Sequence, residues 1–412
     1  MPVVKVGIAS INHKASIQLP ASKSISNRLL IIRALCEHDF DIENLSDSDD
    51  TQLLQHALEH ADTLTDFDVD NAGTAFRFLT ALFAIKTGYR ILTGSERMAQ
   101  RPIAPLVNTL NALGAKISYP ITSGFPPILI HGTVLQGGKA SIRAHISSQF
   151  VSALLLIAPT MEQGLQLELK NTIASQPYIQ MTLDLMRYYG IAWEWNGHVI
   201  TIYPQKYRAK NILVEADWSA AAFWYEIVAL SEHAEIELMG LQKNSWQGDA
   251  KVAEIYEKLG VQTHYHSDSV VLTKTKQVTD FLEYDFLSVP DLFPSVAACC
   301  TALNVPFTFT GLQNLNMKES ERVTVLIHEL MKFGFQPVYQ NPATVSFAGF
   351  EKKQRHETVV CDSHNDHRIA MALAPLCIMN YNISLTDAEC VKKSYPNFFT
   401  DLQSAGFFVK TS

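Results

Sequence analysis

The chain has 412 residues, of which 47% are hydrophobic and 18% are charged, and its formal net charge is −8. This length favours two or three domains with enough chain for large cores. The acidic balance argues against a protein that binds nucleic acid through a general basic field. Any cations that bind anions must therefore be concentrated in one place.

The N-terminal residues 1–6 lack a basic segment followed by a long apolar core, so we expect no signal peptide. No apolar run approaches the ~18 residues that a membrane-spanning helix needs. The six cysteines show no paired metal-ligand spacing and mostly lie in apolar surroundings, which is typical of buried free thiols in a reducing cytoplasm. We expect a cytoplasmic protein that uses neither a membrane nor a nucleic-acid partner.

Glycines that end predicted amphipathic helices recur at an almost constant spacing. A glycine is the usual helix stop, but five at so regular a spacing indicate a repeated supersecondary unit of about 70 residues. Residues 51–61 fit the same helix in a first copy that lacks the glycine, which gives six copies. The five glycines are Gly114, Gly190, Gly260, Gly334 and Gly406.

The copies contain strand-like stretches as well as helices, for example at residues 139–144, 211–215 and 306–310. Mixed strands and helices predict α/β layers and not a helical solenoid. Composition marks no flexible linker. Two groups of three copies would divide the chain near residue 215, just before a predicted helix over residues 218–225.

Several cations lie near the expected N-terminal ends of apolar helices. Such an end already carries positive potential, so a cation there is unfavourable unless an anion binds. In residues 314–322 we expect Asn316 to cap a helix, with Lys318 and Arg322 on one face. A solvated first turn screened by neighbouring glutamates is the alternative interpretation. The pattern as a whole predicts an anion-binding cleft. The other cations of this kind are Lys23, Arg28, Arg77, Arg101 and Arg368.

Serines and isolated carboxylates complete this set. Ser147 and Ser148 precede an apolar run, where they either cradle a phosphate or act as ordinary helix caps. Asp291 lies among apolar residues and prolines, so it is either a cap or a carboxylate suited to proton transfer at the edge of a cleft. Glu319, between two cations, has the same potential.

Other chemistries are weakly indicated. The sequence has no P-loop, no dinucleotide fingerprint and no Gly-x-Ser-x-Gly elbow. Asp362, His364, Asp366 and His367 are close together, yet there is no H-E-x-x-H and no cysteine set. A helix entry with solvated histidines is the better interpretation, so we expect no metal and no cofactor.

Nine segments, in order and over nearly the whole chain, together resemble the family of 5-enolpyruvylshikimate-3-phosphate synthases. Each segment alone is a weak signal, but nine in order are highly specific. The segments are LPASKSISNR (19–28), NAGTAFR (71–77), RPIAPL (101–106), SSQF (147–150), SQPY (175–178), PDLFP (290–294), NLNMKESER (314–322), NDHRIAMA (365–372) and KKSYPNF (392–398).

The resemblance implies two similar domains, each of three βαβαββ-type units, with the active site between them. It assigns residues 1–20 and 215–412 to one discontinuous domain and residues 21–214 to the other. The six-copy period agrees with this fold, although the period alone does not predict that the chain crosses between domains.

The implied reaction transfers the enolpyruvyl group of phosphoenolpyruvate to the 5-hydroxyl of shikimate 3-phosphate, through a tetrahedral intermediate that releases phosphate. This is a step of the shikimate pathway to chorismate and the aromatic amino acids. Both substrates carry a phosphate and a carboxylate, and four anionic groups would explain eight candidate cations in an acidic protein. The resemblance implies a monomer that needs no cofactor.

The family's roles are carried over residue by residue. Asp291 would pair with the 5-hydroxyl as a base, while Glu319 and Lys23 would be candidates for proton delivery to the methylene carbon. The shikimate 3-phosphate site would comprise Ser24 and Arg28 on the carboxylate, Ser147, Ser148, Ser175 and Lys318 on the phosphate, and Gln149, Tyr178 and Asn314 at or near the ring. The phosphoenolpyruvate site would comprise Lys23, Arg101, Arg322, Arg368, Lys393 and the Gly73 backbone, with Arg77 as a further substrate-binding cation.

Two alternatives stay open. The sister family that acts on UDP-N-acetylglucosamine shares the fold and typically carries a reactive cysteine before its Arg-Pro block, but residues 94–100 contain none. A non-catalytic anion-binding protein of the same fold is the other alternative, and the presence of Lys23, Asp291 and Glu319 argues against it. Phe78 stands where many relatives have proline, and the unsubstituted Gly73 predicts sensitivity to glyphosate.

Overall fold

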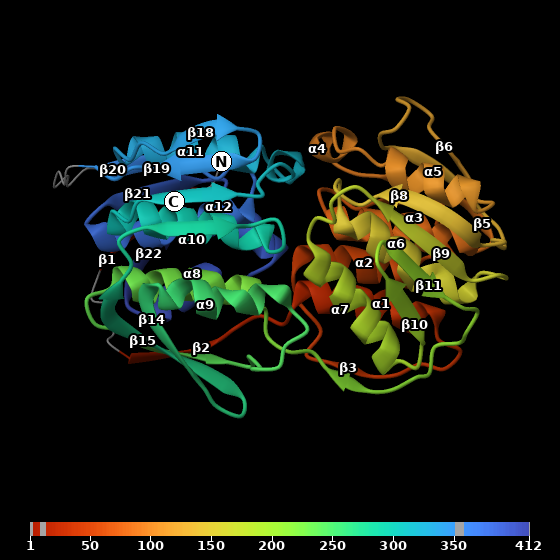
Figure 1. Cartoon of the computed structure of the whole chain (residues 1–412), viewed down its shortest axis with the longest axis horizontal. Helices are drawn as coiled ribbons and strands as arrows, with labels where there is room; N and C mark the ends of the chain where they lie inside the picture. The colour runs from red at the N-terminus through yellow and green to blue at the C-terminus, as the bar shows by residue number, and fades with distance from the viewer. Residues whose placement is uncertain (1–2, 9–13, 351–357, 412) are drawn as a thin grey trace. The chain divides into compact units, whose positions relative to one another are not determined.

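The computed structural model describes residues 3–8, 14–350 and 358–411. The chain divides into two compact units, one formed by Met1–Ala21 with Glu215–Ser412 and the other by Ser22–Val214. Both units are built from the same small motif of strands and helices (Figure 1).

Within the described residues, five four-stranded sheets share one strand order. In each sheet the first two strands of the copy are parallel, and the fourth strand lies antiparallel between the second and the third. A helix follows each of the first two strands, because parallel neighbours need a long crossover connection whereas the last two strands need a short turn. The copy therefore reads βαβαββ, which confirms the predicted α/β fold class.

The unit of Met1–Ala21 and Glu215–Ser412 holds three complete copies. The first contains β2 (Lys14–Gln18), α8 (Trp218–Leu230), β13 (Glu235–Met239), α9 (Val252–Glu257), β14 (Leu259–Tyr265) and β15 (Ser269–Val278). The second contains β16 (Leu282–Asp285), α10 (Phe293–Leu303), β17 (Phe307–Thr310), α11 (Arg322–Lys332), β18 (Val338–Asn341) and β19 (Thr344–Phe347). The third contains β20 (Thr358–Asp362), α12 (His367–Leu373), β21 (Asn382–Thr386), α13 (Phe398–Ser404), β22 (Phe407–Thr411) and β1 (Val3–Ile8).

The unit of Ser22–Val214 holds two complete copies and a shortened one. The complete copies are β4 (Asp66–Asp68), α3 (Gly73–Ile85), β5 (Gly88–Thr93), α4 (Glu96–Ala99), α5 (Ala104–Ala112), β6 (Lys116–Ser118) and β7 (Ile128–Gly132), followed by β8 (Gly138–Arg143), α6 (Ser148–Ile157), β9 (Leu165–Lys170), α7 (Gln176–Tyr188), β10 (Trp193–Asn196) and β11 (Val199–Ile202). The shortened copy is β12 (Ile212–Leu213), α1 (Lys23–Leu35), β3 (Ile42–Glu43) and α2 (Asp49–Glu59).

The shortened copy explains why one helix of the repeat lacks its glycine. The five glycines at the repeat spacing all have positive φ, from 82° at Gly260 to 106° at Gly114, a conformation that glycine adopts without strain. Each turns the chain into the third strand of its copy, except that Gly260 lies inside β14 at an irregularity in the strand pairing. After α2 the chain passes to β4 without such a strand, so no glycine is needed there.

The first helices of the copies form the buried centre of each unit. Helices α8, α10 and α12 pack against one another in one unit, and α1, α3 and α6 do so in the other (Figure 1). Helix α8 is buried along its whole length apart from Ser219, as expected of a helix that is apolar on all sides. Strand β9, in contrast, alternates buried and exposed residues, so its sheet has one face toward the helices and one toward solvent.

The cysteines agree with the expectation of buried thiols. Five of the six are buried, and all six are free. Burial raises the pKa of Cys361, Cys377 and Cys390 to about 12, so these thiols carry little thiolate at neutral pH. Among the described residues, no helix has both the length and the apolar character needed to cross a bilayer.

Glu226 is an unusual residue in this core. It is fully buried on α8, burial raises its pKa well above the ordinary value, and neither carboxyl oxygen has a hydrogen-bond partner among the described residues. A buried polar group without a partner costs about 1–3 kcal/mol. We expect Glu226→Met to raise the free energy of unfolding by a similar amount in urea titrations. Glu226→Gln keeps two unsatisfied polar atoms and is the control; equal stability of the two variants would contradict this account.

Candidate functional site

In the unit of Met1–Ala21 and Glu215–Ser412, the candidate site is centred on Arg322, the first residue of α11. Its side chain is 1% exposed and bonds to three carboxylates. Nε and Nη2 donate to the two oxygens of Asp366 (2.9 and 3.1 Å), and Nη1 donates to Asp291 (3.0 Å). Nη2 also donates to Glu319 (2.6 Å). Burial lowers the pKa of Arg322, but the three carboxylates outweigh it and raise the pKa above the usual range. This arginine is fixed as a cation.

Asp291 is shared among three cations. Arg322 holds one of its oxygens, Arg368 donates to the other (3.0 Å), and the Lys318 ammonium lies 3.8 Å away. Burial raises the pKa of Asp291, but Arg368, Lys318 and Arg322 together lower it well below its ordinary value. Burial lowers the pKa of Lys318, and the charge of Asp291 partly offsets this effect. The carboxylate is therefore ionised while these cations surround it.

Local structure explains how these groups meet. Asp291 lies in the short 3-10 helix Pro290–Leu292 that leads into α10, and Asp366 caps the N-terminus of α12, where its side chain accepts from the Arg368 N–H. Because α10 and α12 pack together, their N-terminal ends bring Asp291 and Arg368 into contact. Lys393 lies beside the same turn and donates to the main-chain oxygen of Asn365 (3.2 Å).

The helix predicted with Asn316 as its N-cap begins five residues later than expected. Residues Leu315–Met317 form a 3-10 turn and α11 starts at Arg322, so Lys318 and Arg322 do not share a helix face. Asn316 still serves the helix, because its side-chain oxygen accepts from the Val323 N–H (2.9 Å). Carboxylates, chiefly Asp366, offset the repulsion expected between Lys318 and Arg322. From the sequence, Asp366 was predicted only to lie at the start of a helix. The histidines of that entry are not all solvated, since His367 is buried.

Asp249 is a second buried carboxylate near this cluster. It is 2% exposed and accepts from the Ser219 hydroxyl at the start of α8. Burial and the charge of Asp291 raise its pKa to about 6, against opposing effects of Arg368 and Ser219. Asp249 was not predicted from the sequence, because it lies outside the segments that carry the cations.

The raised pKa of Asp249 predicts a specific pH dependence of stability. Between its ordinary pKa near 4 and about 6 the folded state binds more protons than the unfolded state, so the free energy of unfolding falls as the pH rises through this window. We expect Asp249→Asn to be more stable than the wild type at pH 7.5 by up to about 3 kcal/mol and equally stable near pH 4. Urea unfolding at both pH values tests this, with the exposed Asp280→Asn as control. A difference that is the same at both pH values would contradict it.

In the unit of Ser22–Val214, Arg28 is the most distinctive candidate. Its guanidinium is buried and donates to the Thr182 hydroxyl (2.7 Å), the Ser152 hydroxyl and the main-chain oxygens of Ser24 and Tyr178. Among the described residues, no carboxylate lies within ion-pair distance of it. Burial lowers the pKa of Arg28 to about 10, and the centroid of the Phe78 ring lies 5.5 Å from the guanidinium carbon. A buried cation with neutral partners is a strong candidate for binding an anion.

Arg101 and Arg77 surround the start of α3. A Cβ at Gly73 would lie 2.7–2.8 Å from the terminal nitrogens of Arg101, so the close approach of this guanidinium to the backbone requires glycine. Arg77 donates to the main-chain oxygens of Gly73 (3.3 Å) and Pro102 (3.4 Å). Both arginines are at most 5% exposed and hold the loop between α4 and α5 against α3.

Lys23 is the first residue of α1 and forms an ion pair with Asp50 of α2 at 3.0 Å. Sequence reasoning did not identify Asp50, although it lies in an acidic stretch at the start of a predicted helix. The pair is largely buried, with side chains 12% and 7% exposed. Lys23 is therefore held in a defined position by a neighbouring helix.

The remaining predicted residues lie at helix starts. Ser147 caps α6 by accepting from the Gln149 N–H, and Gln149 donates to the Thr74 hydroxyl beside Gly73 (3.1 Å). Ser175 precedes α7 with a φ of 54°, a left-handed conformation that costs energy in a residue other than glycine and is often found at functional sites. Ser148 is nearly buried, and Asn314 begins the 3-10 turn before Lys318.

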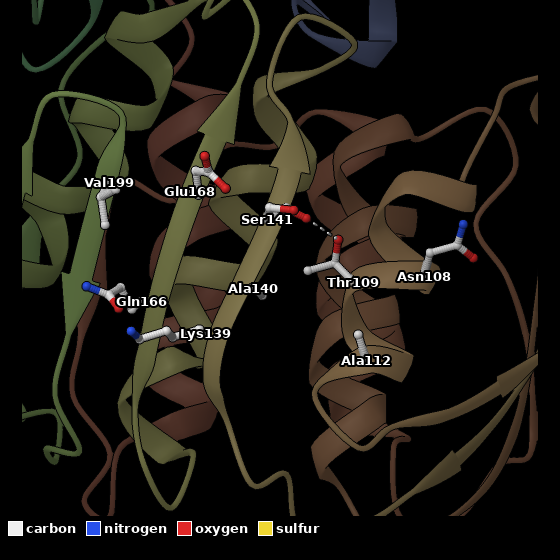
Figure 2. A pocket seen from close by; sticks show the side chains of 9 residues that line it. All are labelled: Asn108, Thr109, Ala112, Lys139, Ala140, Ser141, Gln166, Glu168 and Val199. Carbon is white, nitrogen blue, oxygen red and sulfur yellow. Dashed lines mark hydrogen bonds between the residues drawn. The ribbon is translucent and has the colours of Figure 1, made fainter.

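A pocket of about 630 Å³ in the unit of Ser22–Val214 is a poor candidate for the same chemistry (Figure 2). It lies between α5 and the strands β8, β9 and β11, and Thr109 bridges its walls by donating to the Ser141 main-chain oxygen (3.4 Å). None of the residues predicted from the sequence lines it. Its lining residues are Asn108, Thr109, Ala112, Lys139, Ala140, Ser141, Gln166, Glu168 and Val199.

The model of the family EPSP synthase (3-phosphoshikimate 1-carboxyvinyltransferase) matches residues 9–66 and 60–402. The chain is 45% identical over 398 residues to a protein of Bacteroides fragilis strain YCH46 named 3-phosphoshikimate 1-carboxyvinyltransferase, covering 96% of each. A protein of the same name from Pseudoalteromonas translucida is 32% identical, with 94% of this chain and 96% of the relative covered. A solved structure of EPSP synthase from Acinetobacter baumannii has the same fold, with a TM-score of 0.78 at 20% identity and full coverage of both chains.

Proposed function

Because the chain belongs to the EPSP synthase (3-phosphoshikimate 1-carboxyvinyltransferase) family, we propose that it transfers the enolpyruvyl group of phosphoenolpyruvate to the 5-hydroxyl of shikimate 3-phosphate. The proposal rests chiefly on Asp291, an ionised carboxylate held among Arg322, Arg368 and Lys318. Such a site offers both a proton acceptor and the positive charge that anionic substrates need.

In the addition step, Asp291 accepts the proton of the 5-hydroxyl of shikimate 3-phosphate. The 5-oxygen then bonds to C2 of phosphoenolpyruvate while C3 gains a proton. Its low pKa makes Asp291 a weak base as long as the three cations surround it. Arg322 and Arg368 would share their charge with the phosphate and carboxylate of phosphoenolpyruvate. Binding of that substrate therefore raises the pKa of Asp291 and prepares it to accept a proton.

Glu319 and Lys23 are the proposed groups for proton transfer at C3. Glu319 accepts a 2.6 Å bond from Arg322, which orients its carboxyl group and couples it to the substrate-binding cations. In the elimination step, a proton leaves the C3 methyl group, the bond from C2 to the phosphate oxygen breaks and phosphate is released. Lys23, oriented by Asp50, would donate the proton to C3 or balance the charge of the leaving phosphate.

Arg28 is proposed to bind the carboxylate of shikimate 3-phosphate with Ser24. A bound carboxylate would give the buried guanidinium the opposite charge that its neutral partners do not supply. Ser147, Ser148, Ser175 and Lys318 are proposed for its phosphate, with Gln149, Tyr178 and Asn314 at the ring. Arg101, Lys393 and the Gly73 backbone complete the phosphoenolpyruvate set. Arg77 acts by positioning, since it donates to the main chain around Gly73.

We also propose that the two compact units correspond to two domains, residues 1–20 with 215–412 and residues 21–214, and that residues of both take part in the reaction. The test of the function is phosphate release by the purified protein with phosphoenolpyruvate alone, with shikimate 3-phosphate, and with UDP-N-acetylglucosamine. We expect release only with shikimate 3-phosphate. Release with the sugar nucleotide would favour the sister family's reaction, and no release from folded protein would favour a non-catalytic anion-binding protein.

Gly73→Ala provides a more local test. The added Cβ would lie 2.7–2.8 Å from the Arg101 nitrogens, so this side chain must move, while its flexible end lets the fold accommodate the change. We expect the KM for phosphoenolpyruvate to rise about tenfold, the equivalent of about 1.4 kcal/mol, with an unchanged KM for shikimate 3-phosphate. Ala72→Gly is the control at the preceding position. Equal changes in both KM values would contradict the assignment of Arg101.

A further inference from the structure

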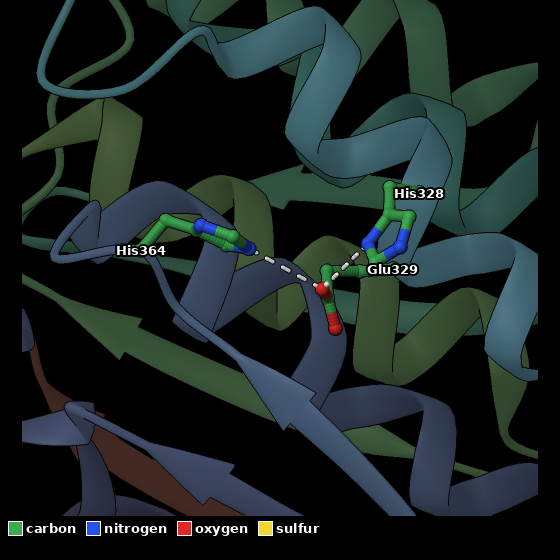
Figure 3. Close-up of side chains that lie close together, drawn as sticks. All are labelled: His328, Glu329 and His364. Atoms are coloured by element: carbon green, nitrogen blue, oxygen red, sulfur yellow. Dashed lines mark hydrogen bonds and ion pairs between the residues drawn. The ribbon is translucent and has the colours of Figure 1, made fainter.

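A second cluster of ligand-type side chains joins α11 to the turn that follows β20. His328 and Glu329 are neighbours in α11, and His364 follows β20 with a φ of 49° (Figure 3). His328 Nδ1 is 3.2 Å and His364 Nε2 is 3.3 Å from the same Glu329 oxygen, Oε1. All three ligand atoms lie within 4.8 Å of one another.

The hydrogen bonds around Glu329 leave too few lone pairs for both imidazoles. Lys332 donates to Oε1 (2.8 Å) and to Oε2 (2.7 Å), and the Asp362 N–H donates to Oε2 (3.0 Å). A carboxylate offers about four acceptor sites in total, and the two rings would bring the number of hydrogen bonds to five. At least one ring nitrogen is therefore poorly served as a donor. A nitrogen lone pair directed at a carboxylate oxygen is favourable when a cation lies between them.

Two of the three spacings among these ligand atoms suit a tetrahedral metal. Zinc binds imidazole nitrogen and carboxylate oxygen at about 2.0–2.1 Å, so adjacent ligand atoms at a tetrahedral centre lie about 3.3–3.4 Å apart. The two observed distances to Oε1 are within about 0.2 Å of that value. The Asp362 N–H would keep hold of Oε2 and orient the carboxylate, as outer hydrogen bonds do at metal sites.

We propose that His328 Nδ1, Glu329 Oε1 and His364 Nε2 form a binding site for a transition-metal dication, with zinc as the preferred ion. The His328 side chain is 67% exposed and His364 is 37% exposed, so the ion reaches the site from solvent and keeps water at its open position. Two imidazoles select zinc over magnesium and calcium, which prefer oxygen ligands. This site is independent of the proposed transfer reaction.

Lys332 makes the site weak and supplies the sharpest test. Its ammonium bonds to the oxygen that would bind the ion, so it must leave Oε1 before zinc enters. Lys332 is one-third exposed and can reach solvent. Lys332→Met removes the competing charge and keeps most of the aliphatic chain. Zinc should therefore bind this variant at least about tenfold more tightly than the parent.

The experiment measures zinc binding to the full chain by calorimetry. The parent protein is His56→Ala/His60→Ala, which lacks the stacked histidine pair at the C-terminal end of α2. We expect one zinc per chain, affinity at least about tenfold lower in His328→Ala and His364→Asn, and no comparable binding of Mg²⁺. Asn tolerates the left-handed backbone at position 364. The proposal would be overturned if neither the parent nor Lys332→Met bound zinc, or if either histidine variant kept full affinity. The three side chains would then make hydrogen bonds only.

Discussion

Replacing Glu319 with Gln should lower kcat by about 10²-fold to 10⁴-fold, the usual contribution of a positioned acid or base. The amide keeps the shape of the side chain and an oxygen that can accept from Arg322, but it cannot exchange a proton with C3 of phosphoenolpyruvate. Substrate affinities should change much less than kcat. Steady-state kinetics with both substrates varied will measure the effect.

Glu321→Gln is the matched control for this prediction. Glu321 is two residues away, exposed to solvent, and caps α11 without a side-chain bond to the helix. Its variant loses the same charge at nearly the same place in the chain, so it should retain kcat within about twofold. If Glu319→Gln also kept near-normal kcat, Lys23 would become the remaining candidate for proton delivery.

Replacing Arg322 with Met should have the largest effect on stability. The substitution leaves Asp291, Glu319 and Asp366 without their shared cation, and the removal of one partner from a buried ion pair costs about 3–5 kcal/mol. Activity should be lost as well, because the same guanidinium is proposed to bind phosphoenolpyruvate. Urea unfolding followed by circular dichroism will measure the loss of stability.

A double variant distinguishes stranded charge from lost packing. Arg322→Met/Asp366→Asn removes one of the three stranded carboxylates, so it should be more stable than Arg322→Met alone. Additive destabilisation of the two single changes would instead show that charge does not explain the effect. Arg322→Lys keeps the charge but not the fork that reaches three carboxylates, and it should lie between the wild type and Arg322→Met in stability.

The repeat was predictable because the glycine that ends each helix is a local signal. Glycine at the turn after a helix is dictated by backbone geometry, and five such positions made the period visible. The pairing of β2 with β13, in which Ile17 lies opposite Leu238, leaves no local signal. The resemblance, and not the period, indicated that the first residues belong with the C-terminal part of the chain.

The cations of the site were predictable, but most of their partners were not. Positive charge at the start of a helix is unfavourable unless an anion binds, so Lys23 and Arg322 could be predicted as site residues. Their carboxylate partners, Asp50 and Asp366, lie 27 and 44 residues away, and the Thr182 partner of Arg28 lies 154 residues away. Such pairs depend on how helices pack, which periodicity does not encode. Asp366 lies in the same segment as Arg368, but no local pattern marks it as the partner of Arg322.

The proposed reaction is an addition followed by an elimination at C2 and C3 of phosphoenolpyruvate. Its most direct test is the reaction of both substrates with the wild-type protein in D₂O, followed by proton and phosphorus NMR. We predict a new enol ether on the 5-oxygen, one phosphate released per product, and deuterium in the vinyl group, since C3 passes through a methyl stage. Enol ether without deuterium would contradict the protonation of C3, and phosphate release without enol ether would contradict the transfer itself.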